Sequence, residues 1–440
     1  MRNALSMAAL FAAAFGLTAC DTLFGESDGP PLPGERISVL RLSRTLVPDP
    51  ALADLRVRLP EPYANTEWPQ PGGFSTHAMQ HLAAGGSLNK AWAASVGEGS
   101  GDDRLILAEP VVAAGRVYAM DAGDTVTAFD AQGGGQAWRV DLTPEGEDDG
   151  LFGGGLAVDG GRLFATTPYG EVVALDTGTG KEQWRIRLPG PLRSAPAASG
   201  GRVFVVTTDN QLFALAQDDG RQLWDYTGIA QDAGLLGGST PAVAGNVVVA
   251  AFSSGELVAF GVDTGRTLWS DSLAGVQRGD AVATLADIRG LPVIDRGKVI
   301  AVSNSGTLTA INLERGGRVW NASIGSSQTP WVAGDFIYIL STNSEVVCLT
   351  RDEGRVRWIQ SLPTFQNEKD REDPIVWAGP VLVGDRLVIT SSAGDAISLS
   401  PYTGEALGRI QLPSSAHLPP IVANNTMYFL SDNGELTAFR

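Results

Sequence analysis

The feature that most constrains the fold of this 440-residue chain is a fixed spacing between a small residue and a tryptophan. In six places a tryptophan follows a small residue after 10 positions, and in a seventh place a glycine replaces the tryptophan. A motif that recurs seven times describes an architecture rather than a single site. The pairs are Ala128 and Trp138, Ala174 and Trp184, Ala214 and Trp224, Ala259 and Trp269, Ala310 and Trp320, Cys348 and Trp358, and Ser398 and Gly408.

A glycine also stands four residues before the second member of each pair, and its position has a physical interpretation. A β-rich run such as EVVAL ends, the chain turns through polar residues, and a new run carries the tryptophan. Glycine at a fixed place in such a turn suggests a positive φ, which glycine adopts at little cost. The small residue leaves space for an indole from a neighbouring element, and an indole buries a large area. The glycines are Gly134, Gly180, Gly220, Gly265, Gly316, Gly354 and Gly404.

Two further β-rich runs precede each motif, so the repeating unit has four strands. In segments such as GRLFATTPYGEVVAL, two apolar runs flank a short polar turn, and a shorter run often opened by proline comes before them. Each polar turn is typical of an antiparallel hairpin. Successive tryptophans from Trp138 to Trp358 lie 38 to 51 residues apart. Four antiparallel strands at this period indicate a β-propeller blade.

The last copy of the motif is incomplete, and this predicts how the ring closes. Its small residue, Ala438, lies two positions before Arg440, so its tryptophan has to come from elsewhere. Trp92, in SLNKAWAASVG, has no small partner and lies one period before Trp138. We therefore expect residues 87–97 to supply the missing outer strand, which leaves no open sheet edge. The predicted fold is all-β, an eight-bladed propeller of four-stranded antiparallel blades over residues 87–440.

The N-terminus predicts export and a lipid anchor. Residues 1–19 carry one positive charge, then a short apolar run, which is typical of a signal peptide. Leu17, Thr18, Ala19 and Cys20 match the bacterial lipobox, and this resemblance implies cleavage before Cys20 and acylation of that cysteine. The alternative is ordinary secretion with an incidental cysteine. Asp21 follows, and in some Gram-negative bacteria aspartate at that place retains a lipoprotein in the inner membrane. This rule does not hold in all lineages, so the outer membrane is the expected location and the inner membrane the alternative.

Residues 20–86 form a second region, rich in proline. Nine prolines between residues 30 and 71 exclude a regular helix or a central strand over most of it. We expect a tether and then an extended arm that lies on the ring. Trp68, in WPQPGG, is expected to plug either the propeller wall or one mouth of its channel.

Composition and charge exclude several classes of function. The net charge is −17 and there is no run of basic residues, so nucleic-acid binding is not expected. The GTGK of LDTGTGKEQW, residues 178–181, resembles a phosphate loop, but it joins two strands rather than a strand and a helix. His77 and His81 have a spacing that can hold a metal, but no third ligand accompanies them. The second cysteine, Cys348, is expected to be a buried core residue.

Two acidic segments, 145–150 and 368–373, are interpreted as solvated loops rather than calcium sites, because neither has the EF-hand spacing. We find no catalytic constellation in the sequence and expect neither a cofactor nor an enzyme. Binding is instead expected on the long connections that lead from each tryptophan strand to the next blade. Propeller topology brings these connections to one face, and loops on a rigid scaffold commonly carry binding residues.

The repeat resembles the tryptophan-docking motif of quinoprotein alcohol dehydrogenases. Together with the length, the lipobox and the closing strand, it also resembles the BamB family of outer-membrane protein assembly factors over about residues 68–440. In that family, inter-blade loops dock onto a POTRA domain of the barrel-assembly protein BamA. The resemblance therefore implies that Leu192 and Arg193 of PLRSAP, with Asp287 of TLADIRGLP, bind this partner. The chain departs from the family pattern at Gly190, where the family has leucine, and at Arg289, where it has a second aspartate.

Three functional hypotheses follow. The first is a non-catalytic lipoprotein scaffold of the β-barrel assembly machinery on the periplasmic face of the outer membrane, with unfolded outer-membrane proteins as possible further partners. The second is a quinone-dependent dehydrogenase, although such enzymes are longer and carry a vicinal cysteine pair, whereas this chain has only two distant cysteines. The third is a periplasmic ligand-binding propeller of another purpose.

Overall fold

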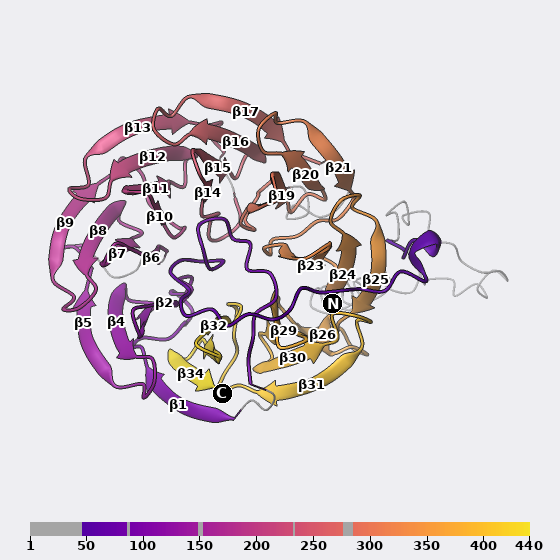
Figure 1. Cartoon of the computed structure of the whole chain (residues 1–440). Helices are drawn as coiled ribbons and strands as arrows, with labels where there is room; N and C mark the ends of the chain where they lie inside the picture. Colours follow the sequence, from indigo (N-terminus) through magenta and orange to yellow (C-terminus); the bar gives the residue numbers. More distant parts are fainter. Residues whose placement is uncertain (1–45, 86–88, 148–152, 232–233, 276–284) are drawn as a thin grey trace, which may run out of the picture. The chain divides into compact units, whose positions relative to one another are not determined.

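Eight antiparallel sheets of four strands each are arranged in a ring (Figure 1). The structure is a computed structural model, which describes residues 46–85, 89–147, 153–231, 234–275 and 285–440. Residues Leu46–Arg440 form one compact unit. The predicted signal peptide, Cys20 and the first part of the tether lie outside the described residues. Among the described residues, none belongs to a helix that is long and apolar enough to span a membrane.

The first four blades follow one another along the chain, each running from its innermost to its outermost strand. Blade 1 contains β2 (Val111–Ala113), β3 (Arg116–Met120), β4 (Thr125–Asp130) and β5 (Gln136–Asp141). Blade 2 contains β6 (Gly155–Asp159), β7 (Arg162–Thr166), β8 (Glu171–Asp176) and β9 (Glu182–Arg187). Blade 3 contains β10 (Ala197–Ser199), β11 (Arg202–Val206), β12 (Gln211–Ala216) and β13 (Gln222–Thr227). Blade 4 contains β14 (Ala242–Ala244), β15 (Val247–Ala251), β16 (Glu256–Gly261) and β17 (Thr267–Ser272).

The other four blades complete the circle. Blade 5 contains β18 (Val293–Asp295), β19 (Lys298–Val302), β20 (Leu308–Asn312) and β21 (Arg318–Ala322). Blade 6 contains β22 (Trp331–Ala333), β23 (Phe336–Leu340), β24 (Glu345–Thr350) and β25 (Val356–Ser361). Blade 7 contains β28 (Trp377–Val383), β29 (Arg386–Ser391), β30 (Asp395–Leu399) and β31 (Ala406–Gln411), preceded by a hairpin of β26 (Phe365–Asn367) and β27 (Glu372–Pro374). Blade 8 contains β32 (Ile421–Ala423), β33 (Thr426–Leu430), β34 (Glu435–Phe439) and β1 (Lys90–Ser95).

The register of the strands explains the spacing of 10 residues in the sequence. In every blade the small residue of the third strand lies directly opposite the tryptophan position of the fourth strand. Ala174, for example, pairs with Trp184, and Ala438 pairs with Trp92. Cys348 pairs with Trp358 and is fully buried, as predicted. A large side chain opposite the indole would compete with it for the same space.

Each indole also contacts the next blade, and this contact explains the glycines. The indole N–H of Trp138 donates to the Thr177 carbonyl of blade 2 at 3.0 Å, and the remaining six docking tryptophans make the equivalent bond at 2.7–3.2 Å. The ring of Trp138 lies against Gly180, where a Cβ atom would come within 2.7 Å of it. Gly180 also has a φ of +74°. Glycine is therefore required for two reasons, a positive φ and the close approach of the indole.

Gly408, the one docking position without an indole, faces blade 8, in which the first and last strands of the propeller meet. In the other blades the indole lies against the turn that joins the third and fourth strands of the next blade. For position 408 of blade 7, this would be the turn of blade 8. In the described part of blade 8 no such turn exists, because β34 and β1 come from opposite ends of the chain. An indole at position 408 would therefore lack the glycine and the carbonyl that receive the other seven. This is a physical reason why glycine is tolerated at the seventh position.

The ring closes as the sequence predicts. Strand β1 pairs antiparallel with β34, and the backbones of Asn89 and Arg440 exchange hydrogen bonds of 2.8 and 2.9 Å beyond the strand ends. The indole of Trp92 then docks on blade 1 through the Ala131 carbonyl at 3.2 Å. The first and last segments of the propeller are thus joined by backbone pairing and by the same indole contact that joins the other blades.

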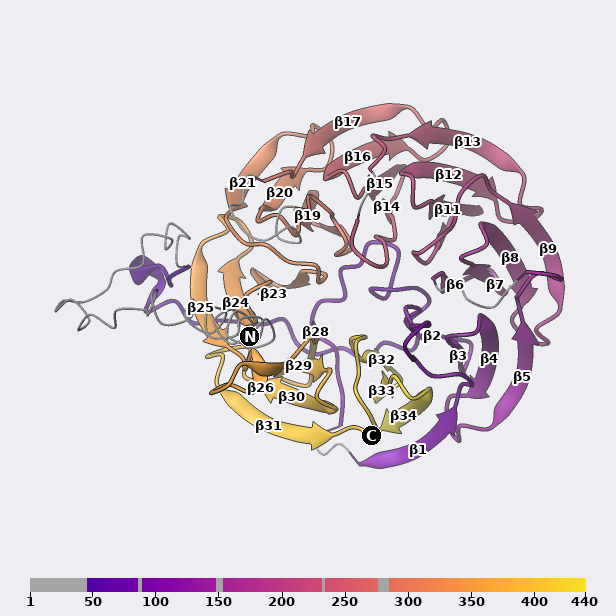
Figure 2. The same cartoon turned by 180° about the vertical axis from the view of Figure 1, so that it is seen from behind.

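The arm, residues 46–85, crosses the middle of the ring in Figure 1 and lies behind the blades in Figure 2. Between Asn65 and Leu82 it makes a hydrogen bond with the innermost strand, or the turn that follows this strand, in every blade. The circuit follows the order of the blades. It joins Asn65 to blade 8, Trp68 to blade 1, Pro69 to blade 2, Gln70 to blade 3, Ser75 to blade 4, Thr76 to blade 5, Gln80 to blade 6 and Leu82 to blade 7.

The arm covers one particular end of the channel. Gly334 and Gly384, which it contacts, lie in turns between first and second strands. Since neighbouring strands are antiparallel, these turns lie opposite the long inter-blade connections. The arm therefore covers the channel on the side away from the inter-blade loops, and Trp68 lies at the channel end rather than in the wall. The predicted boundary at residue 87 stays a prediction, because the arm packs against the ring.

We expect Gly180→Ala to destabilise the fold, because the added Cβ atom meets the Trp138 indole at a positive φ. The loss in the free energy of unfolding should be about 1–3 kcal/mol, measured by chemical denaturation. Gly408→Ala is the matched control, since a Cβ atom at that position meets nothing within 4 Å. Equal stability of the two variants would contradict the role given to the docking glycines.

Candidate functional site

Three connected hollows lie in the channel and open toward its loop face, the face that the inter-blade connections surround and the arm leaves uncovered. We name them by position. The floor pocket, of about 100 Å³, lies against the arm. The mouth, of about 740 Å³, opens above it, and the loop cleft, of about 290 Å³, lies beside it between blades 3 and 4. The mouth shares Leu107, Arg289, Ser327, Gln328 and His417 with the floor pocket, so the two form one continuous space.

The floor pocket is built from the arm below and the inter-blade loops around it. Trp68, Pro71, Gly72 and His77 of the arm contribute to its lining. The indole of Trp68 is 2% exposed and stacks on Trp331 of blade 6, with ring centroids 6.3 Å apart. The two indoles form an apolar base, and Leu107 and Leu291 add aliphatic walls. Such a concave, mostly apolar space with a few polar groups is typical of a ligand site.

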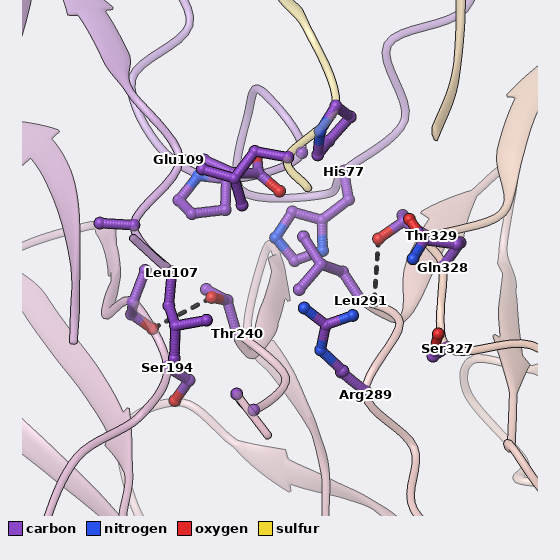
Figure 3. Close-up of a pocket in the computed structure, with 18 of the residues that line it drawn as sticks. His77, Leu107, Glu109, Ser194, Thr240, Arg289, Leu291, Ser327, Gln328 and Thr329 are labelled. Atoms are coloured by element: carbon purple, nitrogen blue, oxygen red, sulfur yellow. Dashed lines mark hydrogen bonds between the residues drawn. The ribbon is translucent and has the colours of Figure 1, made fainter. Parts of the chain in front are cut away.

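Two charged side chains line this space. Figure 3 shows the Arg289 guanidinium beneath Leu291 and His77, with the Glu109 carboxylate on the other side of the His77 ring. Burial raises the pKa of Glu109 to about 7, although the Gly72 N–H and the charge of Arg289 both lower it. Burial also lowers the pKa of Arg289, while Glu109 and Asp287 raise it. The two groups influence each other without forming an ion pair among the described residues.

The two spaced histidines of the arm have separate structural roles. His77 bonds through Nδ1 to the Pro292 carbonyl at 2.8 Å, and burial lowers its pKa to about 4, so the ring is neutral. The Nδ1–H group must then be the donor to Pro292. His81 bonds through Nδ1 to the Pro60 carbonyl at 2.8 Å. Among the described residues, no group of three His, Cys, Asp or Glu side chains is placed to hold a metal ion.

The mouth is lined largely by apolar side chains from three inter-blade connections. They come from segments 105–107, 235–236 and 375–377, and most are half-buried. Val376 is among the exposed large hydrophobic residues. A concave apolar surface rimmed by polar turns is typical of a site for a protein partner or an apolar ligand. The apolar members are Leu105, Ile106, Leu107, Leu235, Leu236, Leu340, Ile375, Val376 and Trp377.

The loop cleft brings together two of the residues implied by the family resemblance. Arg193 and Asp287 both line it, although the chain separates them by two blades. Arg193 is exposed. Asp287 is 6% exposed and accepts a hydrogen bond of 2.7 Å from the Leu235 backbone N–H. Burial raises the pKa of Asp287, while this bond and Arg289 lower it. Asp287 therefore fixes the loop that carries Leu235 at the border of the mouth.

Leu192 lies in a different environment. Its side chain is 0% exposed and packs in the core between blades 2 and 3, against residues such as Phe164 and Leu188. Its backbone carbonyl accepts from the Gly154 N–H at 3.1 Å. In this structure Leu192 anchors the loop from inside, and a contact between its side chain and a partner would require the loop to move. Partner binding by Leu192 stays a prediction.

The two departures from the family pattern also find a physical account. A Cβ atom at Gly190 would lie 2.7 Å from an Asp209 carboxylate oxygen, so a larger residue at this place would require the exposed Asp209 side chain to move. Arg289, which stands where the family has a second aspartate, reaches into the floor pocket and the mouth. The reversed charge is thus placed inside the channel, and the loop cleft retains Asp287 as its carboxylate.

Sequence reasoning missed Glu109, Trp331 and Trp377, although the sequence held a signal for two of them. Seven of the ten tryptophans lie at docking positions. The three that break the spacing are Trp68, Trp331 and Trp377, and all three line the floor pocket or the mouth. A tryptophan outside the repeat was therefore a marker of the channel. Glu109 carried no comparable signal.

The family model described as outer membrane protein assembly factor BamB matches residues 122–360, which is more than half of the chain. The chain belongs to the BamB family. Among curated members, BamB of Salmonella typhimurium is 30% identical over 155 residues, which cover 35% of this chain and 37% of that protein. BamB of Escherichia coli is 28% identical over 151 residues. The chain thus matches somewhat over a third of the length of these relatives.

Solved structures share the fold at lower identity. BamB from Moraxella catarrhalis superposes with a TM-score of 0.66 and 21% identity, covering 80% of this chain and all of that one. Quinohemoprotein alcohol dehydrogenase from Comamonas testosteroni has a TM-score of 0.65 and 12% identity, covering 85% of this chain and 80% of that one. The propeller is therefore common to BamB and to these dehydrogenases, and the fold does not separate the two functions.

The pair of His417 and Asp432 at the mouth gives a direct test of the local electrostatics. Their Nδ1 and Oδ2 atoms lie 2.6 Å apart, and this bond raises the pKa of His417 above 6.5 although burial and Arg289 lower it. Because the folded chain holds this proton more tightly than the unfolded chain, the pair stabilises the fold below pH 6.5. That contribution, below about 1 kcal/mol for a half-exposed pair, is lost as the pH rises through the folded pKa.

We therefore expect an NMR titration to give His417 a pKa above 6.5 and Asp432→Asn to lower it. The chain has three histidines, and His77 serves as the internal control because its low pKa should not respond to this substitution. An unchanged His417 pKa in the variant would show that the pair does not form.

Proposed function

We propose that this protein is a non-catalytic scaffold of the machinery that assembles β-barrel proteins in the outer membrane. In this proposal it is acylated at Cys20, lies on the periplasmic face of the outer membrane and binds a POTRA domain of BamA through its loop face. The observation that carries the proposal is the match of the BamB family model to residues 122–360. Asp21 leaves retention in the inner membrane as the alternative location.

The geometry of the loop face supports this proposal. Arg193, exposed at the loop cleft, is the residue that we expect to contact the partner. Asp287 acts by positioning, because its carboxylate holds the Leu235 backbone. Leu192 anchors the loop that carries Arg193 from within the core. The neighbouring mouth offers half-buried leucines, which suit an apolar segment of BamA or of an unfolded outer-membrane protein.

The main alternative is a quinone-dependent dehydrogenase, which the shared propeller fold alone favours. The chain has only Cys20 and Cys348, so it has no vicinal cysteine pair of the kind that these enzymes carry. Stoichiometric binding of pyrroloquinoline quinone in the presence of Ca²⁺, followed by the absorbance of the cofactor, would favour the enzyme over the scaffold. A ligand-binding propeller unrelated to membrane assembly is the third possibility.

We expect Arg193→Glu to weaken binding to BamA because it reverses the charge at the loop cleft. Removing a charged contact at such an interface commonly costs about 1–3 kcal/mol, which is roughly a 5- to 150-fold loss in affinity. The measurement is capture of purified BamA POTRA domains by the immobilised chain, with titration of the dissociation constant. Arg221→Glu is the matched control, since Arg221 is exposed in the turn at the other end of blade 3.

No binding by the unchanged chain would reject the proposed partner. Equal loss of affinity in both variants would show that only the net charge matters, and it would remove the loop cleft from the proposal. Leu235→Asp then provides an independent probe of the mouth, because Leu235 lines both the mouth and the loop cleft.

A further inference from the structure

Three polar groups in the floor pocket have hydrogen-bonding capacity that no described residue uses. The Nε1–H of Trp68 and the Nε2 of His77 are buried without a partner in the described part of the chain. The Arg289 guanidinium makes neither a hydrogen bond nor an ion pair with another described residue, and only the more distant charges of Glu109 and Asp287 act on it. All three side chains line the same hollow.

Such an arrangement is costly, so it requires a physical explanation. Buried polar groups in folded proteins are almost always paired, and an unpaired buried donor costs about 1–3 kcal/mol. Arg289 is half-buried, so its guanidinium keeps some contact with water from the mouth but has no counter-ion paired with it among the described residues. Trp68 and His77 are 2% and 3% exposed, and the arm holds both in place through backbone bonds to several blades. The arm therefore holds the two unpaired groups of Trp68 and His77 in fixed positions in the pocket.

We propose that the floor pocket binds a small organic anion with a flat apolar body, whose anionic group pairs with Arg289. A guanidinium presents planar donors that match a carboxylate in a two-point contact. The apolar body would lie against Leu107, Leu291 and the stacked indoles of Trp68 and Trp331. This site is separate from the loop cleft, and the proposal does not depend on the scaffold function.

The remaining unused groups specify the ligand further. His77 is neutral and donates through Nδ1 to Pro292, so its Nε2 is an acceptor. Trp68 offers only a donor. A ligand that carries a hydroxyl or amine besides its anionic group would satisfy His77, and an oxygen on its body would satisfy Trp68. The pocket thus selects for a polar substituent on an otherwise apolar ring.

The size and position of the pocket permit entry from the loop face. A volume of about 100 Å³ far exceeds the roughly 10–15 Å³ that one water needs on the same kind of measure. The pocket continues into the mouth of about 740 Å³ through residues common to both, with Arg289 among them. The apolar lining of the mouth also suits the body of such a ligand as it enters.

Glu109 offers a second test, because its charge acts on Arg289 more strongly than that of Asp287. Its carboxylate lowers the local positive potential without pairing with the guanidinium. At pH 8, above the pKa of about 7 that burial gives Glu109, its carboxyl is largely ionised, so replacement by glutamine removes a negative charge and keeps the shape of the side chain. We therefore expect Glu109→Gln to bind the anion more tightly, an increase in affinity that misfolding cannot produce.

The test compares 2-naphthoate with the uncharged 2-naphthamide, titrated into the purified chain by calorimetry at pH 8. We expect one 2-naphthoate per chain, bound about tenfold more tightly than 2-naphthamide, because a charge-assisted contact is worth about 1.4 kcal/mol or more. Arg289→Gln should remove this preference and leave 2-naphthamide binding unchanged. Glu109→Gln should increase it, and Arg221→Gln, at the opposite end of blade 3, should have no effect.

Several results would overturn the proposal. Equal affinity for the two naphthyl compounds, or a preference that persists in Arg289→Gln, would show that Arg289 does not receive an anion. No increase in Glu109→Gln would reject the competition between the two groups. Inorganic phosphate that binds as tightly as 2-naphthoate would show a site for simple anions without an apolar body. The melting temperature of each variant separates loss of binding from loss of fold.

Discussion

The contact between an indole of one blade and a glycine of the next is the interaction on which the rest of the structure depends. It couples three conditions in one place: a small residue opposite the tryptophan, a glycine with positive φ in the next blade, and a carbonyl that accepts the indole N–H. Each condition has its own position in the sequence. This contact fixes neighbouring sheets in angle and separation, together with ion pairs between blades such as Arg202 with Asp263 and Arg351 with Asp295. A ring of eight then closes when β1 brings the eighth strand and its indole.

The arm adds a second set of connections that the repeat does not contain. Its backbone and side chains form hydrogen bonds with the innermost strands of all eight blades in order, so the arm joins blades that are not neighbours in the chain. The arm also determines which end of the central channel stays open. Trp68 and His77 close one end of the channel, and the inter-blade loops surround the other end, onto which the loop cleft and the mouth open. The proposed partner surface and the proposed anion site both follow from this asymmetry.

Much of the ring could be predicted from the sequence because the register of adjacent strands is a local property. The spacing from Ala174 to Trp184 reflects one turn and one cross-strand pair, and it is repeated. The missing partner of Ala438 predicted the role of Trp92 for the same reason. The circuit of the arm could not be predicted, since backbone carbonyls such as that of Pro69 carry no sequence signal for their distant partners. Of the three residues implied for the partner site, Arg193 and Asp287 share a cleft, whereas Leu192 is buried because loop conformation decides exposure.

The most direct test of the account is amide hydrogen exchange in β1, the strand that closes the ring. The closed ring predicts that peptides covering Lys90–Ser95 exchange as slowly as those covering Gln136–Asp141, the outer strand of blade 1, because both pair with a third strand and both carry a docked indole. Protection rises with the free energy needed to open a strand. Rapid exchange in Lys90–Ser95 while Glu435–Phe439 stays protected would contradict closure of the ring, and with it the single loop face on which both proposed sites depend.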